Sequence, residues 1–470
     1  MKFTNRKREM TRLDRLASLK QGGLGVLWGR RRVGKTRLLL EWCRKYKGVY
    51  YVADESSASV QRKYLSFALD QSLPGFSTVD YPDWTTLFLR LAQDAKAANW
   101  RGPLVIDEFP YLIATTPELP SILQRFIDNE AKSANLILAL SGSSQRMMQG
   151  AILDASAPLY GRAQELIKLG PISVGYMGEA LELKNAIDII KSYSIWGGIP
   201  RYWELVANCA SSFLENIDTI VLDPMGQLFD EPNRLLLEES PSAINLRPIL
   251  DAIGLGSHKL SEIAGRIGQQ ATSLARPMQR LIELDLIERE IPYGMQEQNS
   301  KRVLYKIKDP FLRFWFEVVA SHRSMFTQIT STNRKKILEK ALPGLFAAMW
   351  EELARLAVPW LSQMWEDGNL LGQAGRYWHG NGPEWDIVAE SYDRSSILIG
   401  EAKWTKNVSA PWVYDTIKDL QLKGLPPIKI SETTSKVYAL FIPEKPLELN
   451  IAPNVRVIDA QEVLLALQQV

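Results

Sequence analysis

Short apolar runs alternate with longer amphipathic runs through residues 1–170. The apolar runs are Leu24–Trp28, Gly48–Ala53, Leu104–Ile106 and Leu136–Leu140. Runs of this length are typical of buried strands, and the longer amphipathic runs between them are typical of helices. The alternation predicts βα units around a parallel sheet, which is an α/β fold.

The pattern changes beyond this region. Residues 175–240 are predicted to be helical, with an interruption at Gly197–Pro200. Residues 244–319 predict three helices and then two strands around a polar loop: Ile244–Gly254, Lys259–Ile267, Ser273–Leu284, Leu286–Ile291 and Arg302–Ile307. Pro277 fits the third helix if Ser273 is the N-cap, because a proline in the first turn removes no helical hydrogen bond. Three helices and a β-ribbon resemble a winged helix.

The last part of the chain has a third pattern. The stretch Ser321–Lys340 is polar and basic, which predicts a linker. A helix then leads into two strands joined by a turn, Pro383–Glu390 and Ser396–Trp404. Seven of the fourteen tryptophans lie in residues 350–412, and this shift in composition indicates a separate C-terminal module.

Composition and charge exclude several classes of protein. The 470 residues are 46% hydrophobic and 23% charged, as in a folded globular protein rather than a disordered chain. The net charge of +3 excludes a histone-like polycation, so any nucleic-acid surface must be local. Two cysteines, Cys43 and Cys209, are too few for a disulfide framework or a four-cysteine zinc site. Because the chain also lacks an apolar signal region and a stretch of about 20 apolar residues, we expect a cytoplasmic protein with no membrane contact.

A phosphate-binding loop follows the first predicted strand. The residues Gly29-Arg30-Arg31-Arg32-Val33-Gly34-Lys35-Thr36 fit the pattern G-x-x-x-x-G-K-[ST]. Such a loop surrounds phosphates with backbone N–H groups at the start of the next helix, here predicted over Thr36–Lys45. Lys35 is expected to reach the β- and γ-phosphates of ATP, and the Thr36 hydroxyl to ligate Mg²⁺. A glycine turn that contains Lys-Thr by chance is the alternative, and the strand–loop–helix order disfavours it.

Two acids end the strand Leu104–Ile106. We expect Asp107 to hold Mg²⁺ through water, and Glu108 to act as the general base that polarises the attacking water. An apolar run that ends in Asp-Glu is common in surface loops, so this signal depends on the phosphate-binding loop that accompanies it.

Two further polar segments are candidates for the same site. The strand Leu136–Leu140 is followed by Ser141-Gly142-Ser143-Ser144, and either Ser141 or Ser143 would contact the γ-phosphate or the attacking water. A serine-rich turn is the alternative. Arg162 would stabilise transition-state charge, either in its own chain or across the subunit interface of a homo-oligomer. A solvated arginine is the alternative for Arg162.

Five motifs along the chain carry a family resemblance. They are Phe3-x-Asn5-Arg6-x-x-Glu9, Gly29–Thr36, Val105–Glu108, Leu159–Arg162 and Gly197–Pro200. With them the chain resembles the archaeal-type P-loop ATPases of the AAA+/STAND group, and the order of the later modules extends the resemblance over most of the sequence. The resemblance implies that Asn5 and Arg6 lie near the nucleotide and that Gly197–Pro200 belongs to a helical lid.

The predicted C-terminal hairpin brings charged residues together. Asp386 lies on its first strand, and Glu401 and Lys403 lie on the second, where their spacing of two places them on one face. Two carboxylates suit Mg²⁺, and Lys403 would orient the attacking water. The set resembles the PD-(D/E)XK nuclease fold, in which Glu351 on the preceding helix resembles a further acidic metal ligand. A solvated hairpin face is the alternative.

The middle module suggests contact with DNA. As in other winged helices, its third helix would enter a groove, with Arg276, Gln279 and Arg280 pointing outward. The charge of this module is only mildly basic, so a platform that packs against the ATPase is the alternative.

The sequence therefore predicts an α/β protein with four parts: a P-loop ATPase core (1–170), a helical lid (171–242), a winged helix (243–325) and a PD-(D/E)XK nuclease-like domain (335–470). The expected cofactors are ATP and Mg²⁺. The leading hypothesis is an ATPase coupled to a Mg²⁺-dependent nuclease that acts on nucleic acid, with DNA favoured, in genome defence or DNA processing. One alternative is a nucleotide-switched signalling ATPase whose terminal module only binds a partner. The other is a DNA-binding regulator with an inactive nuclease fold.

Overall fold

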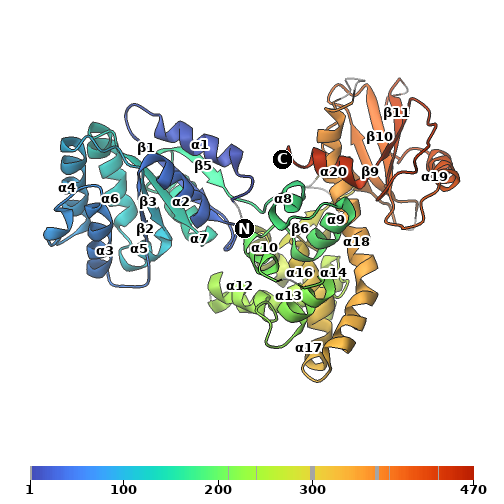
Figure 1. The fold of residues 1–470 in the computed structure, drawn as a ribbon, viewed down its shortest axis with the longest axis horizontal. Coiled ribbons are helices and arrows are strands. Elements are labelled where there is room, and N and C mark those ends of the chain that lie inside the picture. The colour runs from blue at the N-terminus through green and yellow to red at the C-terminus, as the bar shows by residue number, and fades with distance from the viewer. Residues whose placement is uncertain are drawn as a thin grey trace. The chain divides into compact units, whose positions relative to one another are not determined.

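The computed structural model describes residues 3–209, 211–239, 241–296, 302–365, 370–380, 382–431 and 433–469. The chain divides into two compact units, shown in Figure 1. The first unit comprises residues 3–171 and 199–201. The second comprises residues 172–198 and the chain from residue 202 onward.

The first unit is built on a five-stranded sheet in the order β2-β3-β4-β1-β5, with all neighbouring strands parallel. Its strands are β1 (Gly23–Trp28), β2 (Val49–Val52), β3 (Leu104–Asp107), β4 (Ile137–Gly142) and β5 (Ala163–Lys168). Its helices, which lie on both faces of the sheet in Figure 1, are α1 (Lys7–Ala17), α2 (Lys35–Tyr46), α3 (Ala58–Asp70), α4 (Trp84–Ala97), α5 (Phe109–Thr115), α6 (Leu119–Phe126) and α7 (Gln145–Met148). The prediction of a parallel α/β sheet is confirmed, and the first four strands lie where they were expected.

The edge strand β5 was not predicted. Its burial alternates, with Glu165 and Ile167 buried between exposed neighbours, so it lacks the continuous apolar run of the inner strands. The buried carboxylate of Glu165 accepts hydrogen bonds at 2.6 Å from both Arg12 and Arg15 of α1. Because Glu165 is charged, nothing in the sequence indicated that its position in the strand is buried.

The second unit begins with helices and a two-stranded antiparallel ribbon. Its helices are α8 (Met177–Leu181), α9 (Ala186–Trp196), α10 (Pro200–Ala207, of which the first two residues belong to the first unit), α11 (Phe213–Ile217), α12 (Glu231–Glu239), α13 (Arg247–Gly254), α14 (Leu260–Ile267), α15 (Ala275–Glu283), α16 (Pro310–Phe314) and α17 (Ser321–Phe326). The ribbon pairs β6 (Ile287–Glu290) with β7 (Leu304–Ile307). The three helices α13–α15 and the ribbon follow in the predicted order. Pro277 lies in the first turn of α15 as expected, but Ser273 is not the N-cap: it lies in a preceding 3₁₀ turn, and its hydroxyl donates to the Gln270 carbonyl at 2.7 Å.

The predicted linker Ser321–Lys340 is wrong. The stretch forms α17 and the start of α18 (Ser331–Ser362), a helix of 32 residues. Its polar and basic side chains suggested solvent exposure, but Arg334 is only 7% exposed and forms an ion pair with the buried Asp218. None of the helices in the described ranges is long and apolar enough to cross a membrane.

The C-terminal part contains a second five-stranded sheet, in the order β12-β11-β10-β9-β8. Its elements are β8 (Gly375–Tyr377), β9 (Trp385–Glu390), β10 (Ser396–Ala402), α19 (Ala410–Lys423), β11 (Ser435–Phe441), β12 (Val455–Ile458) and α20 (Ala460–Ala466). β10 pairs antiparallel with β9 and parallel with β11, so the predicted hairpin is present inside a mixed sheet. α18 packs on β9 and β10, and Trp350 Nε1 donates to the Phe441 carbonyl at 3.1 Å.

Candidate functional site

The loop between β1 and α2 adopts a backbone that requires glycine at two positions. Gly29 has φ 154°, and a Cβ atom there would lie 2.3 Å from the Leu169 carbonyl oxygen. Gly34 has φ 94° and is the N-cap of α2. Any other residue would be strained at these positions, so the two glycines allow the loop to wrap back over the start of α2, where backbone N–H groups favour an anion.

Lys35 lies beneath this loop. Its Nζ donates to the carbonyl oxygens of Gly29 at 2.9 Å and Arg30 at 3.1 Å, and the residue is only 5% exposed. The side chains of Arg30, Arg31 and Arg32 are half-buried, whereas Val33 is buried in the unit. The lysine thus points into the turn of the loop, as a phosphate-binding lysine requires.

Arg6 links the same loop to Gly170, which lies just after β5 in the chain. Its guanidinium donates to the carbonyl oxygens of Val33 at 2.8 Å and Gly170 at 2.7 Å, and to Glu9 at 3.1 Å. Burial lowers the pKa of Arg6, although the Glu9 carboxylate partly opposes this effect. Arg6 therefore lies beside the phosphate-binding loop, as the resemblance implied, and its hydrogen bonds hold the loop's backbone in place.

The register of the sheet brings the predicted residues to one edge. Trp28 at the end of β1 pairs with Gly142 at the end of β4, and Leu140 of β4 pairs with Ile106 of β3. The carboxyl ends of three neighbouring strands therefore meet beside the loop, which is where open parallel sheets bind ligands.

Asp107 is the centre of the hydrogen bonds at this edge. Its Oδ2 accepts from the Thr36 hydroxyl at 2.8 Å and from the Tyr50 hydroxyl at 2.5 Å, and its Oδ1 accepts from the Glu108 N–H at 3.0 Å. Asp107 is 1% exposed. Since a carboxylate and a hydroxyl oxygen meet at the loop, this donor set fits a hard cation such as Mg²⁺. Tyr50 was not predicted, because a tyrosine in an apolar strand gives no signal of a polar contact made 57 residues away.

Glu108 makes a contact that separates the two candidate serines. Its Oε2 accepts from the Ser143 hydroxyl at 2.8 Å and from the Ser143 N–H at 3.3 Å. Ser141 is fully buried, and among the described residues its hydroxyl has no hydrogen-bond partner. The structure thus brings Ser143, rather than Ser141, to the predicted general base. Glu108 itself has φ 52°, a left-handed conformation that is uncommon for a residue with a side chain.

Arg162 lies at the opposite edge of the sheet. It precedes β5, whose first residue, Ala163, pairs with Leu24 near the start of β1. Five residues of strand, about 17 Å, separate Leu24 from Gly29. Arg162 forms an ion pair with Asp128 at 2.9 Å. This position contradicts a role for Arg162 at the loop of its own chain and leaves the role across a subunit interface as a prediction.

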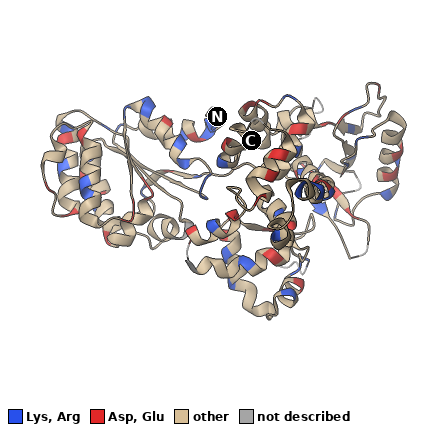
Figure 2. Ribbon diagram, turned by 60° about the horizontal axis from the view of Figure 1, so that its bottom comes forward, with Lys and Arg blue, Asp and Glu red and all other residues tan. Residues whose placement is uncertain are grey.

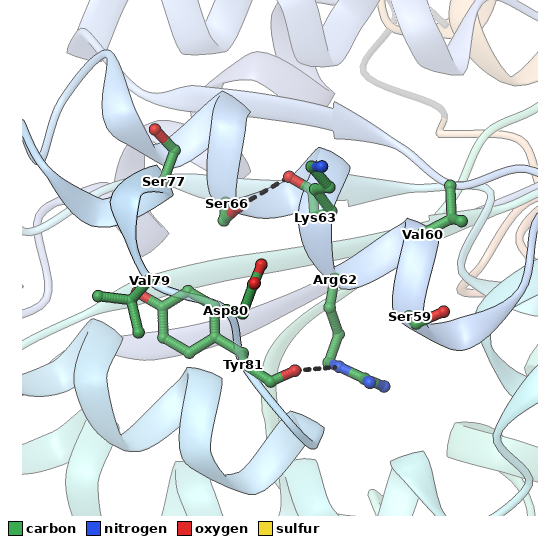
Figure 3. A pocket seen from close by; sticks show the side chains of 9 residues that line it. All are labelled: Ser59, Val60, Arg62, Lys63, Ser66, Ser77, Val79, Asp80 and Tyr81. Carbon is green, nitrogen blue, oxygen red and sulfur yellow. Dashed lines mark hydrogen bonds between the residues drawn. The ribbon is translucent and has the colours of Figure 1, made fainter.

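A surface hollow of the first unit is distinct from this edge. It lies between α3 and the segment Ser77–Tyr81, and its lining includes Arg62, Lys63 and Ser66 (Figure 3). Arg62 donates there to the Tyr81 carbonyl at 2.9 Å. None of the predicted nucleotide-binding residues lines the hollow.

The C-terminal sheet brings Asp386, Glu401 and Lys403 together. The Lys403 ammonium lies 2.6 Å from Glu401 Oε2 and 3.8 Å from Asp386 Oδ2, and the Ala402 N–H donates to Asp386 Oδ2 at 3.1 Å. Two residues that the sequence did not single out join them. Lys423 of α19 donates to the other oxygen of Glu401, and Arg355 of α18 donates to the Asp386 carbonyl oxygen at 3.1 Å.

The carboxylates predicted to hold a metal ion in this cluster are paired with cations. Among the described residues, no group of three Asp, Glu, His or Cys side chains is placed to hold a metal ion. Both oxygens of Glu401 accept from lysines, and Glu351 lies 3.7 Å from Arg355. We expected a cation to relieve the repulsion among Glu351, Asp386 and Glu401, but the three cations Lys403, Lys423 and Arg355 already balance their charge.

The pKa values of the cluster reflect this arrangement. The pKa of Asp386 is raised, first by burial and then by the nearby charges of Glu401 and Glu351. Burial opposes the ionisation of Glu401, but hydrogen bonds from Lys403 and Lys423 outweigh it and lower its pKa. The site is therefore a set of paired charges rather than a ring of free carboxylates.

One of the three residues of α15 that were expected to contact DNA forms an ion pair within its own unit. Arg276 and Gln279 of α15 are exposed, but Arg280 forms an ion pair with Glu239 at 3.0 Å. Figure 2 shows that Lys and Arg residues are interspersed with Asp and Glu residues along the described part of the chain. Tyr293, after β6, is used against the C-terminal sheet, where its hydroxyl accepts from the Glu390 N–H at 2.9 Å.

Comparisons with known proteins agree with the fold of the first unit. Residues 3–206 match a family described as an ATPase domain predominantly from Archaea, and residues 315–413 match a family of archaeal and bacterial proteins of unknown function. An uncharacterized protein of Methanocaldococcus jannaschii is 28% identical over 425 residues, which are 90% of this chain and 92% of that protein. The solved structure of a Walker-type ATPase of Pyrococcus abyssi is similar with a TM-score of 0.54 and 20% identity, over 67% of this chain and 96% of that one.

The sheet, the loop and these similarities agree with one another. Residues 3–206 match the model of an ATPase domain found mainly in Archaea, and the parallel sheet gives the first unit an α/β fold. The expectation of an archaeal-type P-loop ATPase is supported to this extent.

Proposed function

We propose that the protein binds Mg-ATP at the loop Gly29–Thr36 and hydrolyses it. The loop's N–H groups and Lys35 hold the phosphates. Thr36 and Asp107 hold Mg²⁺, which offsets the charge of the phosphates when it is bound. Glu108 accepts a proton from the attacking water, and Ser143 fixes the direction of the Glu108 carboxylate.

One observation carries this proposal. The Thr36 hydroxyl and the Asp107 carboxylate, which are 71 residues apart in the chain, meet at 2.8 Å directly after the phosphate-binding loop. A glycine turn with a chance Lys-Thr pair would have no reason to lie against a buried aspartate. Lys35 beneath the loop and Glu108 at the same edge supply the two remaining functions.

The experiment that tests it is steady-state ATP turnover with the variant Lys35→Ala. We expect the variant to lose nucleotide binding or turnover, because the loop then lacks its phosphate cation. Lys45→Ala is the matched control, since Lys45 lies on the same helix, is exposed and pairs with Asp14 at 2.7 Å. Turnover by Lys35→Ala at the rate of Lys45→Ala would overturn the assignment.

The C-terminal module has two candidate functions, and a specific observation favours binding of a partner. The lysine pairs of Glu401 and the balanced charges of the cluster support a module that recognises a partner rather than one that loads a metal ion. The convergence of Asp386, Glu401 and Lys403 supports the competing hypothesis, a nuclease that acts on DNA or RNA.

Incubation of plasmid and single-stranded nucleic acid with the protein distinguishes the two hypotheses. The assay is run with and without Mg²⁺ and ATP. Intact nucleic acid under every condition is the result expected for the binding module. Cleavage that is lost in Asp386→Ala would establish the nuclease instead. Salt-sensitive duplex binding that weakens in Arg276→Ala would show that α15, which lies outside this module, contacts nucleic acid.

A further inference from the structure

We infer that Tyr50 is a positioning residue for the carboxylate of Asp107, and that its hydroxyl sets the affinity of the nucleotide site for Mg²⁺. The inference rests on the proposed ATPase function. It concerns the hydrogen bond from the Tyr50 hydroxyl to Asp107 Oδ2, at 2.5 Å, which is separate from the sequence motifs of the loop.

Strand geometry explains why Tyr50 reaches this carboxylate. β2 is the edge strand beside β3, and Val52 pairs with Asp107 in parallel register, so Tyr50 lies two residues earlier on the same face of the sheet. α2, which carries Thr36, contacts both β2 and β3. The hydroxyls of Tyr50 and Thr36 therefore approach Asp107 from neighbouring elements and donate to the same oxygen.

The next residue shows that the contact is not a general property of tyrosines on this strand. Tyr51 points to the other face, where its hydroxyl donates to Gln61 Oε1 of α3 at 2.9 Å. Tyr51 is 5% exposed and belongs to the hydrophobic core. The two adjacent tyrosines thus use their hydroxyls on opposite faces of the strand, Tyr50 at the predicted magnesium carboxylate and Tyr51 at Gln61.

The chemistry of the two donors gives the hydroxyl of Tyr50 a role. Thr36 donates its only proton to Asp107, so the lone pairs of its oxygen remain for a cation. The Tyr50 hydroxyl donates to the same oxygen, Asp107 Oδ2, and so limits the rotation of the carboxylate. Since Asp107 is buried, removal of the Tyr50 hydroxyl leaves Thr36 as the one donor to Oδ2 among the described contacts. Groups that orient a metal-binding residue typically contribute about 10–100-fold to metal affinity or activity.

The test compares Tyr50→Phe with Tyr51→Phe. Each variant removes one hydroxyl together with its hydrogen bonds and keeps the ring. Binding of a fluorescent ATP analogue is measured against Mg²⁺ concentration, and turnover is measured on the same proteins. We expect the half-saturating Mg²⁺ concentration to rise about 10-fold or more in Tyr50→Phe and to stay at the wild-type value in Tyr51→Phe. Nucleotide affinity without Mg²⁺ is expected to be the same in all three proteins.

Two outcomes would overturn the inference. One is an unchanged half-saturating Mg²⁺ concentration in Tyr50→Phe; the other is an equal rise in both variants, which would mean that any buried hydroxyl on β2 matters. The proposed function fails in a different way, through the absence of ATP turnover in the wild-type protein. Because the binding titration needs no turnover, it decides the role of Tyr50 in either case.

Discussion

Replacement of Arg334 by methionine is expected to destabilise the second unit by about 3–5 kcal/mol, because it breaks a buried ion pair from one side. Arg334 Nε and Nη2 donate to the two oxygens of Asp218 at 2.7 and 3.0 Å, and Nη2 also donates to Asp223 at 2.8 Å. Arg334 is 7% exposed and Asp218 is 2% exposed. Without the guanidinium, the Asp218 carboxylate keeps its charge in a place that water does not reach.

The assay is urea unfolding followed by tryptophan fluorescence. For an m-value of about 3 kcal/mol/M, the expected loss lowers the midpoint of the affected transition by about 1–2 M. The exposed pair of Lys191 and Asp188, at 3.2 Å in the same unit, supplies the control: Lys191→Met is expected to cost less than about 1 kcal/mol.

A double-mutant cycle isolates the pair itself. Asp218→Asn removes the stranded charge, so Asp218→Asn combined with Arg334→Met is expected to recover at least about 1 kcal/mol relative to additive effects. Additive effects, or a loss in Arg334→Met no larger than that in Lys191→Met, would refute the reasoning that this contact is buried.

Four further predictions concern the two sites and Arg162. Ser143→Ala is expected to lower kcat at unchanged ATP affinity, because Glu108 loses its hydroxyl partner; an unchanged kcat in the turnover assay would contradict this. Gly29→Ala is expected to abolish nucleotide binding, since its Cβ would meet the Leu169 carbonyl at 2.3 Å, and wild-type affinity for a fluorescent ATP analogue would contradict the loop geometry. Lys423→Met is expected to create uptake of Mg²⁺ in calorimetry without nucleotide, where the wild type shows none, because Glu401 loses one cation; no uptake in the variant would argue against charge balance in the cluster. Arg162→Ala is expected to remove any rise in turnover per subunit with protein concentration, whereas a rise equal to that of wild type would exclude a role across a subunit interface.

The candidate nucleotide site was predictable from sequence where its residues are contiguous. The loop Gly29–Thr36 and the pair Asp107-Glu108 each form a local pattern. Each follows an apolar strand, so both were expected at the carboxyl ends of parallel strands. Tyr50 was not predictable, because its contact with Asp107 depends on which strand pairs with β3. The choice of Ser143 over Ser141 likewise depends on which side chain faces Glu108 across the sheet.

In the C-terminal cluster, the hairpin residues were predictable from the sequence, but the cations that pair with them were not. The spacing of Glu401 and Lys403 and the hairpin to Asp386 were predictable from the alternation of two strands. Lys423 and Arg355 come from helices on either side of the hairpin in the chain, and no local pattern links them to it. The positive charges of Lys423 and Arg355 offset the negative charges of the carboxylates. The carboxylates alone were therefore not enough to predict that the cluster requires Mg²⁺.

The error at Ser321–Lys340 has a similar cause. A polar, basic stretch is usually exposed, but the long helix α18 places one of its arginines against a buried aspartate more than a hundred residues earlier. Burial of a charge depends on its partner, and the partner lies outside the segment from which the linker was predicted.

Identification of the nucleotide that remains bound to Glu108→Gln tests the central claim most directly. The variant and the wild-type protein are mixed with Mg-ATP, separated rapidly from free nucleotide, and the bound nucleotide is analysed. If Glu108 activates the attacking water, hydrolysis slows by about 10²-fold or more, so the variant retains ATP while the wild type retains ADP. Bound ADP in Glu108→Gln at the wild-type rate would contradict hydrolysis at this site.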